Sequence, residues 1–595
     1  MPSTANTAAK SPSKSATAPA APAVASALDA ALTDLAIGSA AWSHLTLGQR
    51  ARLLDRVRAT VVADAATWAD VAATSKGLGP GHPLRGEEWL GGPHAVILAL
   101  DAYRRTLAKL AKGAGPLDGV KTDAAPGGRV RVHAFPLDPV DALLLSGHSG
   151  EIWLQPGITE AEAARSAGLA QLHPTTPGGI GLVLGAGNQS SIPILDVFYE
   201  LLAHNRVVIL KVNPTQDALV PVFERALAPL IELALLRIVT GGGDVGAYLT
   251  QHPDVAHVHI TGAAPTFDTI VWGPSSGAGA AETKRRRAEN RPLLQKPITA
   301  ELGGVSPILV VPGTWTEADL QFQAEHVATM RLQNAGHNCI AGQVVVVSSD
   351  WPQRDAFLAA LEKAYAAAPT RPVWYPRSAE KLRAAAADYP SGQWFAGGTR
   401  ALVEIDGDQD AAALERTEYF APVLGVVELP GLGQEFLDRA VAHADDRLAG
   451  TLGANVLIDP VTQDALGAGF ERAIADLRYG AIAINTWTAF AFLQPTLTWG
   501  GFPGSTIDDV GSGIGIVHNS LLLDHVERTV VRGPFRPFPR SLSAIGRPGT
   551  FSALPKPPWF VTSRTGAAVS EGFSRFQMTR DWAGLVGTML QAFRG

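Results

Sequence analysis

The sequence predicts an α/β protein with two α/β domains, the first of the Rossmann type. Between residues 179 and 263, short β-branched runs alternate with helical runs, which is typical of parallel strands joined by crossover helices. The same alternation starts again after residue 301. With 595 residues, 46% of them hydrophobic, the chain has enough apolar material for more than one large core.

The chain is predicted to open with a disordered tail at residues 1–35. The stretch is rich in Ala, Ser, Pro and Thr, lacks the leucine-rich core of a secretory signal, and carries scattered prolines that oppose a helix. No run of about 18 uninterrupted apolar residues occurs in the chain. We therefore predict no membrane span.

The first domain is predicted to span residues 36–300 and to begin with helices. Thr46 and Gln49 have the spacing of a capping box, and apolar residues follow at helical intervals, so a long amphipathic helix should start there. Another helix is predicted from about His94 to Ala111.

Four strands alternate with helices in the second half of this domain. The apolar run at residues 192–204 predicts a buried helix, and Asn205 is placed to cap its C-terminus. Crossovers between such strands are right-handed, so we expect a parallel sheet. The predicted strands are GIGLVLGAG (179–187), RVVILK (206–211), LLRIVTGGG (235–243) and VAHVHITGA (255–263).

A second α/β domain is predicted at residues 301–480. A strand returns at 481–487, and ERTVVRGPF at 527–535 is predicted to be an edge or interface strand. Residues 536–595 show no clear periodicity apart from a short helical run near 582–593, and no role is assigned to them. The second domain's predicted strands are PILVVPG (307–313), QVVVVSS (343–349) and LGVVEL (424–429), with helices at 318–334 and 354–368.

Charge and cysteine content narrow the classes of function. The formal net charge is −6, whereas a general nucleic-acid-binding protein is normally basic, so no nucleic-acid partner is predicted. The single cysteine excludes an internal disulfide framework and a cysteine-based zinc cluster, and no metal site is predicted. It fits a reducing compartment, so we expect a cytoplasmic protein.

The spacing of Gly241, Gly243 and Gly246 matches a dinucleotide fingerprint. That fingerprint also needs an acidic residue at the end of the next strand, but this strand ends in HITGA, and Asp268 comes several residues too late. We therefore interpret the glycines as a tight turn from strand to helix, with a pyrophosphate cradle as the alternative.

The only cysteine, Cys339, lies among small and polar residues in the stretch NAGHNCIAGQ (334–343). A reactive thiol needs backbone freedom, close substrate approach and nearby dipoles. A structural cysteine lies more often among large apolar residues, and this role stays as the alternative.

Glu301 and Asn188 fit a site built around such a thiol. Glu301 precedes two glycines in an apolar approach to a strand, so it is either a paired structural charge or a general base whose pKa burial raises. Asn188 follows a strand, at the edge where open α/β sheets bind ligands. Its amide suits oxyanion stabilisation, and an ordinary capping or turn role is the alternative.

In their order along the chain, these motifs resemble the aldehyde dehydrogenase superfamily. The resemblance covers roughly residues 40–535 and implies a dinucleotide-binding domain, a catalytic domain and a small oligomerisation element, with strands near 115–150 and in the return segment 481–535. The motifs are the Asn188 turn, a strand ending in Lys211, TGA (261–263), ELGG (301–304), the Cys339 stretch, EYFAPV (418–423) and WGGF (499–502).

The resemblance implies oxidation of an aldehyde to a carboxylic acid with NAD or NADP as cofactor. Cys339 would attack the aldehyde and carry the thiohemiacetal and then the thioester, Asn188 would hold the oxyanion, and Glu301 would activate water. A homodimer or homotetramer is expected, because family members pair through a strand like ERTVVRGPF. The implied cofactor-binding residues are Lys211, Gly262, Glu418 and Phe420.

Three features depart from the family pattern. The turn at 262–267 lacks the usual second glycine and first hydroxyl and contains the bulky Phe267, which puts the cofactor geometry in doubt. Pro214 stands where NAD-preferring relatives often carry Glu, so a barrier to NADP is absent. The segment 273–297 resembles an insertion, and its basic run Lys284–Arg287 is interpreted as a solvated loop or, alternatively, as an anion contact.

Two other functions stay open from the sequence. An acyl-transferring or reductive enzyme of the same fold is one, although a water-activating Glu301 would waste its thioester. A non-catalytic scaffold with impaired cofactor binding is the other, and the altered turn favours it. Trp487, Phe490 and Phe492 predict an apolar or aromatic wall for the substrate channel.

Overall fold

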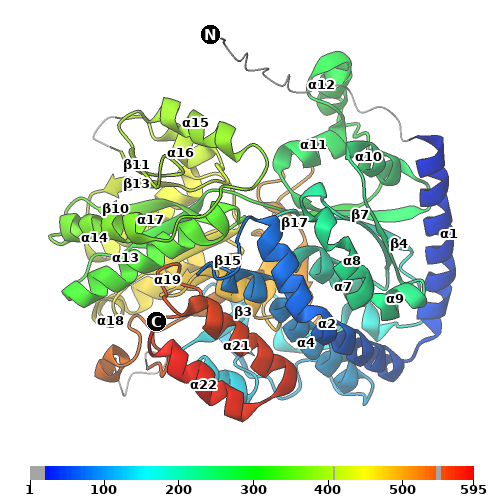
Figure 1. The fold of residues 1–595 in the computed structure, drawn as a ribbon, viewed down its shortest axis with the longest axis horizontal. Coiled ribbons are helices and arrows are strands. Elements are labelled where there is room, and N and C mark those ends of the chain that lie inside the picture. Colours follow the sequence, from blue (N-terminus) through cyan, green and yellow to red (C-terminus); the bar gives the residue numbers. More distant parts are fainter. Residues whose placement is uncertain (1–20, 406–408, 545–550) are drawn as a thin grey trace, which may run out of the picture.

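The fold is α/β, with helices packed around two large sheets (Figure 1), as the sequence predicts. The computed structural model describes residues 21–405, 409–544 and 551–595. The smaller sheet has the strand order β17–β8–β7–β4–β5–β6, and all neighbours in it are parallel except β17 and β8. Its strands are β4 (Ile180–Leu184), β5 (Val207–Lys211), β6 (Leu236–Val239), β7 (Val255–Gly262), β8 (Ile298–Leu302) and β17 (Gly513–Ile514).

Helices cover the smaller sheet and confirm the predicted alternation. The capping box at Thr46 is present, because its Oγ1 accepts a hydrogen bond from the Gln49 N–H and the Gln49 side chain accepts one from the Thr46 N–H. The helices of this half are α1 (Pro22–His44), α2 (Leu47–Ser75), α3 (Gly86–Trp89), α4 (Ala95–Leu110), α7 (Ile192–His204), α8 (Val220–Ala226), α9 (Ala228–Glu232), α10 (Gly243–Gln251), α11 (Ala264–Trp272) and α12 (Ala280–Ala288), with the π-helical turn η1 (Leu90–His94).

Helix α1 corrects the predicted disordered tail, because residues 22–35 are helical. Leu28 and Leu35 of this helix are buried in the core of the smaller-sheet domain. Pro22 does not oppose the helix because it occupies the first turn, where the missing N–H would have had no partner within the helix.

Residues 1–20 of the predicted tail lie outside the described residues. By length and composition, α1 is the one helix among the described residues that could cross a membrane, with 28% of its most apolar window buried. This is a weak indication, since a core helix or a signal sequence near the N-terminus has the same properties.

The larger sheet has the order β1–β2–β3–β19–β15–β14–β9–β10–β13–β12–β11. It is parallel from β19 to β12 and antiparallel at both ends. Its strands are β1 (Thr122–Ala125), β2 (Arg129–Phe135), β3 (Ser149–Leu154), β9 (Ser306–Val310), β10 (Gly342–Ser348), β11 (Gln393–Phe395), β12 (Arg400–Glu404), β13 (Val423–Leu429), β14 (Gly453–Leu457), β15 (Ala481–Ile484) and β19 (Val526–Arg532).

Strands and helices alternate again in the second half of the chain, as the sequence predicts, and the chain ends in a helical pair. β16 (Thr498–Gly500) and β18 (Ile516–Asn519) form a separate small sheet. The remaining helices are α5 (Pro139–Leu144), α6 (Glu160–Ser166), α13 (Glu317–Leu332), α14 (Arg354–Ala367), α15 (Ser378–Asp388), α16 (Ala412–Arg416), α17 (Gly433–Arg447), α18 (Pro460–Leu466), α19 (Ala468–Asp476), α20 (Thr488–Leu493), α21 (Gly566–Thr579) and α22 (Trp582–Ala592).

Strand β19 lies inside the larger sheet, which corrects the prediction of an edge or interface strand at 527–535. It pairs with β3 on one side and with β15 on the other, and Val530 and Val531 are fully buried. Both ladders form within one chain, so the backbone of β19 has no free edge to offer a partner. Of the predicted return segment 481–535, β17 joins the smaller sheet, whereas β15 and β19 join the larger one. Self-association through another surface stays a prediction.

Asn205 ends α7 and joins it to the N-terminal helices. Its φ of 55° is left-handed, which confirms the predicted cap. Its Oδ1 accepts hydrogen bonds from Arg50 Nη1 at 2.7 Å, Gln171 Nε2 at 2.9 Å and Trp42 Nε1 at 3.2 Å. Arg50 is fully buried, and burial lowers the pKa of its guanidinium to about 10, so these acceptors are what make its burial tolerable.

Replacing Asn205 with Ala should lower the free energy of unfolding by about 2–4 kcal/mol, because it leaves a buried guanidinium short of an acceptor. Asn205→Gly should be about 1 kcal/mol more stable than Asn205→Ala, since glycine adopts a left-handed φ without strain. Denaturant unfolding followed by circular dichroism measures both differences. Wild-type stability in the Ala variant would show that the cap does not hold these helices.

Candidate active site

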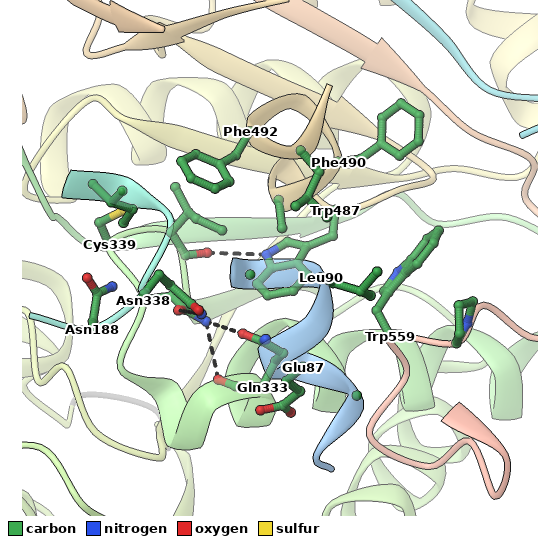
Figure 2. Close-up of a pocket in the computed structure, with 18 of the residues that line it drawn as sticks. Glu87, Leu90, Asn188, Gln333, Asn338, Cys339, Trp487, Phe490, Phe492 and Trp559 are labelled. Atoms are coloured by element: carbon green, nitrogen blue, oxygen red, sulfur yellow. Dashed lines mark hydrogen bonds between the residues drawn. The ribbon is translucent and has the colours of Figure 1, made fainter. Parts of the chain in front are cut away.

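Two cavities meet at the predicted catalytic residues. Cys339, Glu301 and Asn188 line both of them, so these three side chains stand at the junction. The first cavity contains about 1030 Å³ of empty space and the second about 1600 Å³, their open mouths included. Figure 2 shows Cys339 and Asn188 at one side of the first cavity. All seven predicted site residues line the second cavity: Asn188, Lys211, Gly262, Glu301, Cys339, Glu418 and Phe420.

The strands of the smaller sheet bring four of these residues to one edge. Lys211 and Gly262 are the last residues of β5 and β7, Glu301 is the penultimate residue of β8, and Asn188 follows β4. Parallel strands place their carboxyl ends together, and ligands of open α/β sheets bind there. The sequence pattern of the strands therefore accounts for this half of the site.

The Cys339 loop runs from Gln333 to Ile340, between α13 and β10, and is held by an unusual backbone. Asn334 and Ala335 both have left-handed φ values, 52° and 54°, which are costly for residues with a Cβ. The Asn334 Nδ2 donates to the carbonyl oxygens of Asn188 and His337, both at 3.1 Å. Asn188 Nδ2 also donates to the His337 carbonyl, at 2.9 Å. One N–H of the Asn188 side-chain amide thus orients the loop. A side-chain amide has two N–H groups, so the second N–H of Asn188 can donate to another acceptor.

Glu301 is a buried carboxylate. Only 3% of it is exposed, and Trp499 Nε1 donates to its Oε1 at 3.4 Å. Burial raises the pKa of Glu301 to about 7, with a further rise from the charge of Asp196. The group can therefore take and release protons near neutral pH.

The Cys339 thiol and the Glu301 carboxylate influence each other's pKa, and both line the junction of the two cavities. Burial, followed by repulsion from the Glu301 charge, raises the pKa of Cys339 well above its usual range. The resting site at neutral pH therefore holds a thiol rather than a thiolate, and its nearest base is Glu301. This arrangement suits a nucleophile that loses its proton only when it reacts.

The second cavity has polar groups that could hold a nucleotide. Burial raises the pKa of Glu418 to about 7, and its Oε1 is buried with no hydrogen-bond partner. A Cβ on Gly303 would lie 1.9 Å from that oxygen, so only glycine leaves room for the carboxylate there. Phe420 has a left-handed φ of 45°, and its carbonyl accepts a hydrogen bond from His337 Nδ1 at 2.8 Å, which ties this strand approach to the Cys339 loop. Burial lowers the pKa of Lys211.

The altered turn after β7 leaves the second cavity open. Phe267 is fully buried in the core of the smaller-sheet domain, so its bulk points away from the cavity. Ala263 and Thr266, at the N-terminal end of α11, line the cavity instead. A helix N-terminus favours an anionic group such as a phosphate. Phe267 therefore does not narrow the second cavity.

The glycine turn before α10 lines the second cavity, whereas the basic run on α12 lies outside both cavities. Gly242, Gly243 and Gly246 line the second cavity, so this glycine turn does more than connect a strand to a helix. Arg285 and Arg286 of the basic run pair with Glu282, and Arg287 pairs with Asp268. The run lies on α12 rather than on a loop, and none of its side chains lines either cavity. Within the described residues, no cluster of three or more His, Cys, Asp or Glu could hold a metal ion.

Several aromatic side chains line the first cavity (Figure 2). Trp487, Phe490 and Phe492 line it, which confirms the predicted apolar wall. The chain's C-terminal segment (residues 551–595) also reaches it, through Trp559 and Phe560. The sequence carries no signal for these two residues, because their segment has no helical or strand periodicity.

Comparison with known proteins agrees with this geometry. Residues 171–375, which include five of the seven predicted site residues, match the model of the aldehyde dehydrogenase family. An indole-3-acetaldehyde dehydrogenase in complex with NAD⁺ is 17% identical and matches 85% of this chain and 89% of its own, with a TM-score of 0.56. An NAD-dependent aldehyde dehydrogenase from Sinorhizobium meliloti is 19% identical over 84% and 86%, with a TM-score of 0.54. An E. coli NADP-dependent enzyme is 18% identical over 86% and 90%, with a TM-score of 0.54.

At these identities the structural matches establish the fold, which the chain shares with aldehyde dehydrogenases. The match to the aldehyde dehydrogenase family model covers the segments that carry Asn188, Lys211, Gly262, Glu301 and Cys339.

Proposed function

We propose that the protein oxidises an aldehyde to a carboxylic acid, with NAD or NADP as the oxidant and Cys339 as the nucleophile. The observation that carries the proposal is the junction of the two cavities, where the Cys339 thiol, the Glu301 carboxylate and the Asn188 amide meet. The first cavity is mostly apolar and suits an aldehyde, and the second is larger and has more polar groups in its lining. A nucleophilic thiol also needs a reducing compartment, so we propose a cytoplasmic location.

The first half of the reaction uses the thiol, the carboxylate and the amide. Glu301 takes the thiol proton while Cys339 Sγ bonds to the carbonyl carbon of the aldehyde. The carbonyl oxygen becomes an oxyanion, which the Asn188 amide and the Cys339 backbone N–H stabilise. Loss of a hydride from the same carbon re-forms the C=O bond and leaves a thioester on Cys339.

The second half releases the acid. Glu301, once its first proton has left for solvent, takes a proton from a water molecule whose oxygen attacks the thioester carbon. The C–S bond then breaks, the thiolate leaves, and the carboxylic acid departs. A pKa of about 7 allows Glu301 to act as base twice in one turnover.

Residues of the second cavity fit a nicotinamide dinucleotide, which when bound would accept the hydride. The unpartnered Glu418 Oε1 and the side chain of Lys211 suit ribose hydroxyls, and Phe420 lines the same wall. The N-terminal end of α11 and the glycines before α10 suit the pyrophosphate. Because Phe267 is buried in the core, the main support for a scaffold without cofactor is lost. Glu301 beside Cys339 favours hydrolysis over acyl transfer to a carrier.

The direct test measures nicotinamide reduction by the purified protein, with NAD and NADP separately, for short, long and aromatic aldehydes. Replacing Cys339 with Ala should lower kcat/KM by at least about 10³-fold, because the nucleophile is lost. Iodoacetamide should label the wild-type protein once, at its only cysteine, and abolish the same activity. Activity that survives in the Ala variant would contradict the proposal, as would failure of both dinucleotides to be reduced.

The pH dependence of turnover distinguishes the role of Glu301 from that of Glu418, the other buried carboxylate. Only ionised Glu301 can accept a proton, so kcat should rise about tenfold per unit below pH 7 and level off above it. Glu301→Gln should remove this acidic limb of the pH profile, in which kcat rises with pH, and should lower kcat by about 10²–10⁴-fold.

Glu418→Gln is the matched control, since burial also raises the pKa of Glu418 to about 7. This variant should keep the limb and raise the KM for the dinucleotide. A limb that vanishes with Glu418 and persists without Glu301 would reverse the two roles.

A further inference from the structure

The C-terminal segment forms the outer wall of the first cavity. Pro558, Trp559, Phe560 and Gly566 line the same cavity as Cys339. In Figure 2, Trp559 stands at the side of the cavity away from Cys339, and Trp487 and Leu90 lie between them. We propose that this segment is part of the substrate site and that it selects bulky, uncharged, apolar aldehydes. The inference rests on the proposed function of the site.

The chemistry of the wall defines the substrate class. Apart from groups near Cys339, the lining is mostly aromatic and aliphatic: Leu90, Ile192, Trp487, Phe490, Phe492, Leu493, Trp499, Val517, Trp559 and Phe560. None of the described lining residues is Lys or Arg, so an anionic substrate tail would be buried without a counter-ion.

Glu87 is the lining carboxylate away from Cys339, and its charge is paired with the buried Arg371. Its Oε2 also accepts a hydrogen bond from the Asn334 backbone N–H at 3.1 Å, whereas its Oε1 is buried without a hydrogen-bond partner. A cationic tail would therefore find a carboxylate that is already neutralised. An uncharged apolar tail would lose nothing on entering this cavity and would gain from leaving water.

The segment before α21 is fixed against α13, the helix that leads into the Cys339 loop. The Val561 N–H donates to Thr329 Oγ1 at 3.1 Å, and Thr562 Oγ1 donates to Glu325 Oε2 at 2.8 Å. The same carboxylate pairs with Lys556 Nζ at 2.8 Å. These contacts fix the chain just before and just after Trp559 and Phe560, and so they restrict where the two rings can lie.

Ring contacts connect the segment to the cavity's other wall. Phe560 stacks on His326 of α13, with ring centroids 5.0 Å apart. Trp559 meets His148 edge-on at 6.5 Å, and His148 stacks on Phe490 at 4.8 Å. If Trp559 were displaced, the cavity would therefore lose apolar surface, and the His148 ring would lose a neighbour.

Helix α21 closes the wall from the opposite side, against α3 and η1. A Cβ on Gly86 would lie 2.7 Å from Ala567 Cα and 2.9 Å from the Gly566 carbonyl, so the two segments touch along their backbones. Both Gly86 and Gly566 line the cavity, as does Leu90 of η1. The backbones of α3 and of the start of α21 are therefore in close contact at the cavity wall.

The test compares 3-phenylpropanal with propanal, using whichever dinucleotide the wild-type protein reduces. Replacing Trp559 with Ala should lower the ratio of kcat/KM for 3-phenylpropanal over propanal about tenfold, because the variant loses one aromatic contact to the longer substrate. Trp559→Phe should restore most of the ratio. Trp582→Ala is the matched control: Trp582 follows in the same segment but is 50% exposed and lines neither cavity, so the ratio should not change.

Charge is tested with benzaldehyde and 4-carboxybenzaldehyde. The wild-type kcat/KM for the charged aldehyde should be at least about 100-fold lower, because its carboxylate would be buried unpaired. Equal values for the two would overturn the substrate class. An unchanged chain-length ratio in a Trp559→Ala variant that melts at the wild-type temperature would overturn the role of the segment.

A binding measurement keeps the two proposals apart. If no aldehyde is oxidised, the proposed function fails, and calorimetry with 3-phenylpropan-1-ol still tests the wall. The wild-type protein should bind this uncharged alcohol at least about fivefold more tightly than the Trp559→Ala variant, and Trp582→Ala should bind it as the wild type does. Equal affinities of wild type and Trp559→Ala would overturn the inference by this route as well.

Discussion

Asn334 is the residue on which the assembly of the site depends. Its side chain donates to the carbonyl of Asn188 from the smaller-sheet domain, and its Oδ1 accepts hydrogen bonds from Lys76 Nζ and Trp374 Nε1, both at 3.2 Å. Its backbone N–H donates to Glu87. The left-handed conformation at Asn334 persists because this buried environment determines it from several sides. Contacts from both domains thus fix the loop that carries the thiol.

With the loop fixed, burial sets the chemistry. The thiol and carboxylate meet where two cavities join, and the loss of water raises the pKa of both Cys339 and Glu301. Neither group is permanently charged at neutral pH, so each can change its protonation state during a turnover. In the proposed reaction, the mostly apolar first cavity would hold the aldehyde, the second cavity would hold the dinucleotide, and the two would meet at Cys339.

Local sequence patterns predicted the parts of this structure that local physics determines. The alternating strands, the capping box at Thr46 and the cap at Asn205 follow from periodicity and backbone conformation, and strand ends account for where Glu301 and Asn188 lie. Contacts between distant segments left no such signal. Trp559 reaches the cavity only through tertiary packing, and β19 is a central strand because β3 returns beside it. Similarly, α1 was missed because a proline at a helix start differs from one inside a helix only by its position.

The most direct measurement is the intact mass of the Glu301→Gln variant after prolonged incubation with an aldehyde and the reactive dinucleotide at alkaline pH, where hydroxide can take the thiol proton that Glu301 takes in the wild type. We expect an adduct equal to the aldehyde less two hydrogens, attached to Cys339 in the peptide map and dependent on the dinucleotide. Such an adduct is the thioester that can no longer be hydrolysed. No dinucleotide-dependent adduct in a folded variant, or an adduct on a different residue, would contradict the assignment of Cys339 and Glu301.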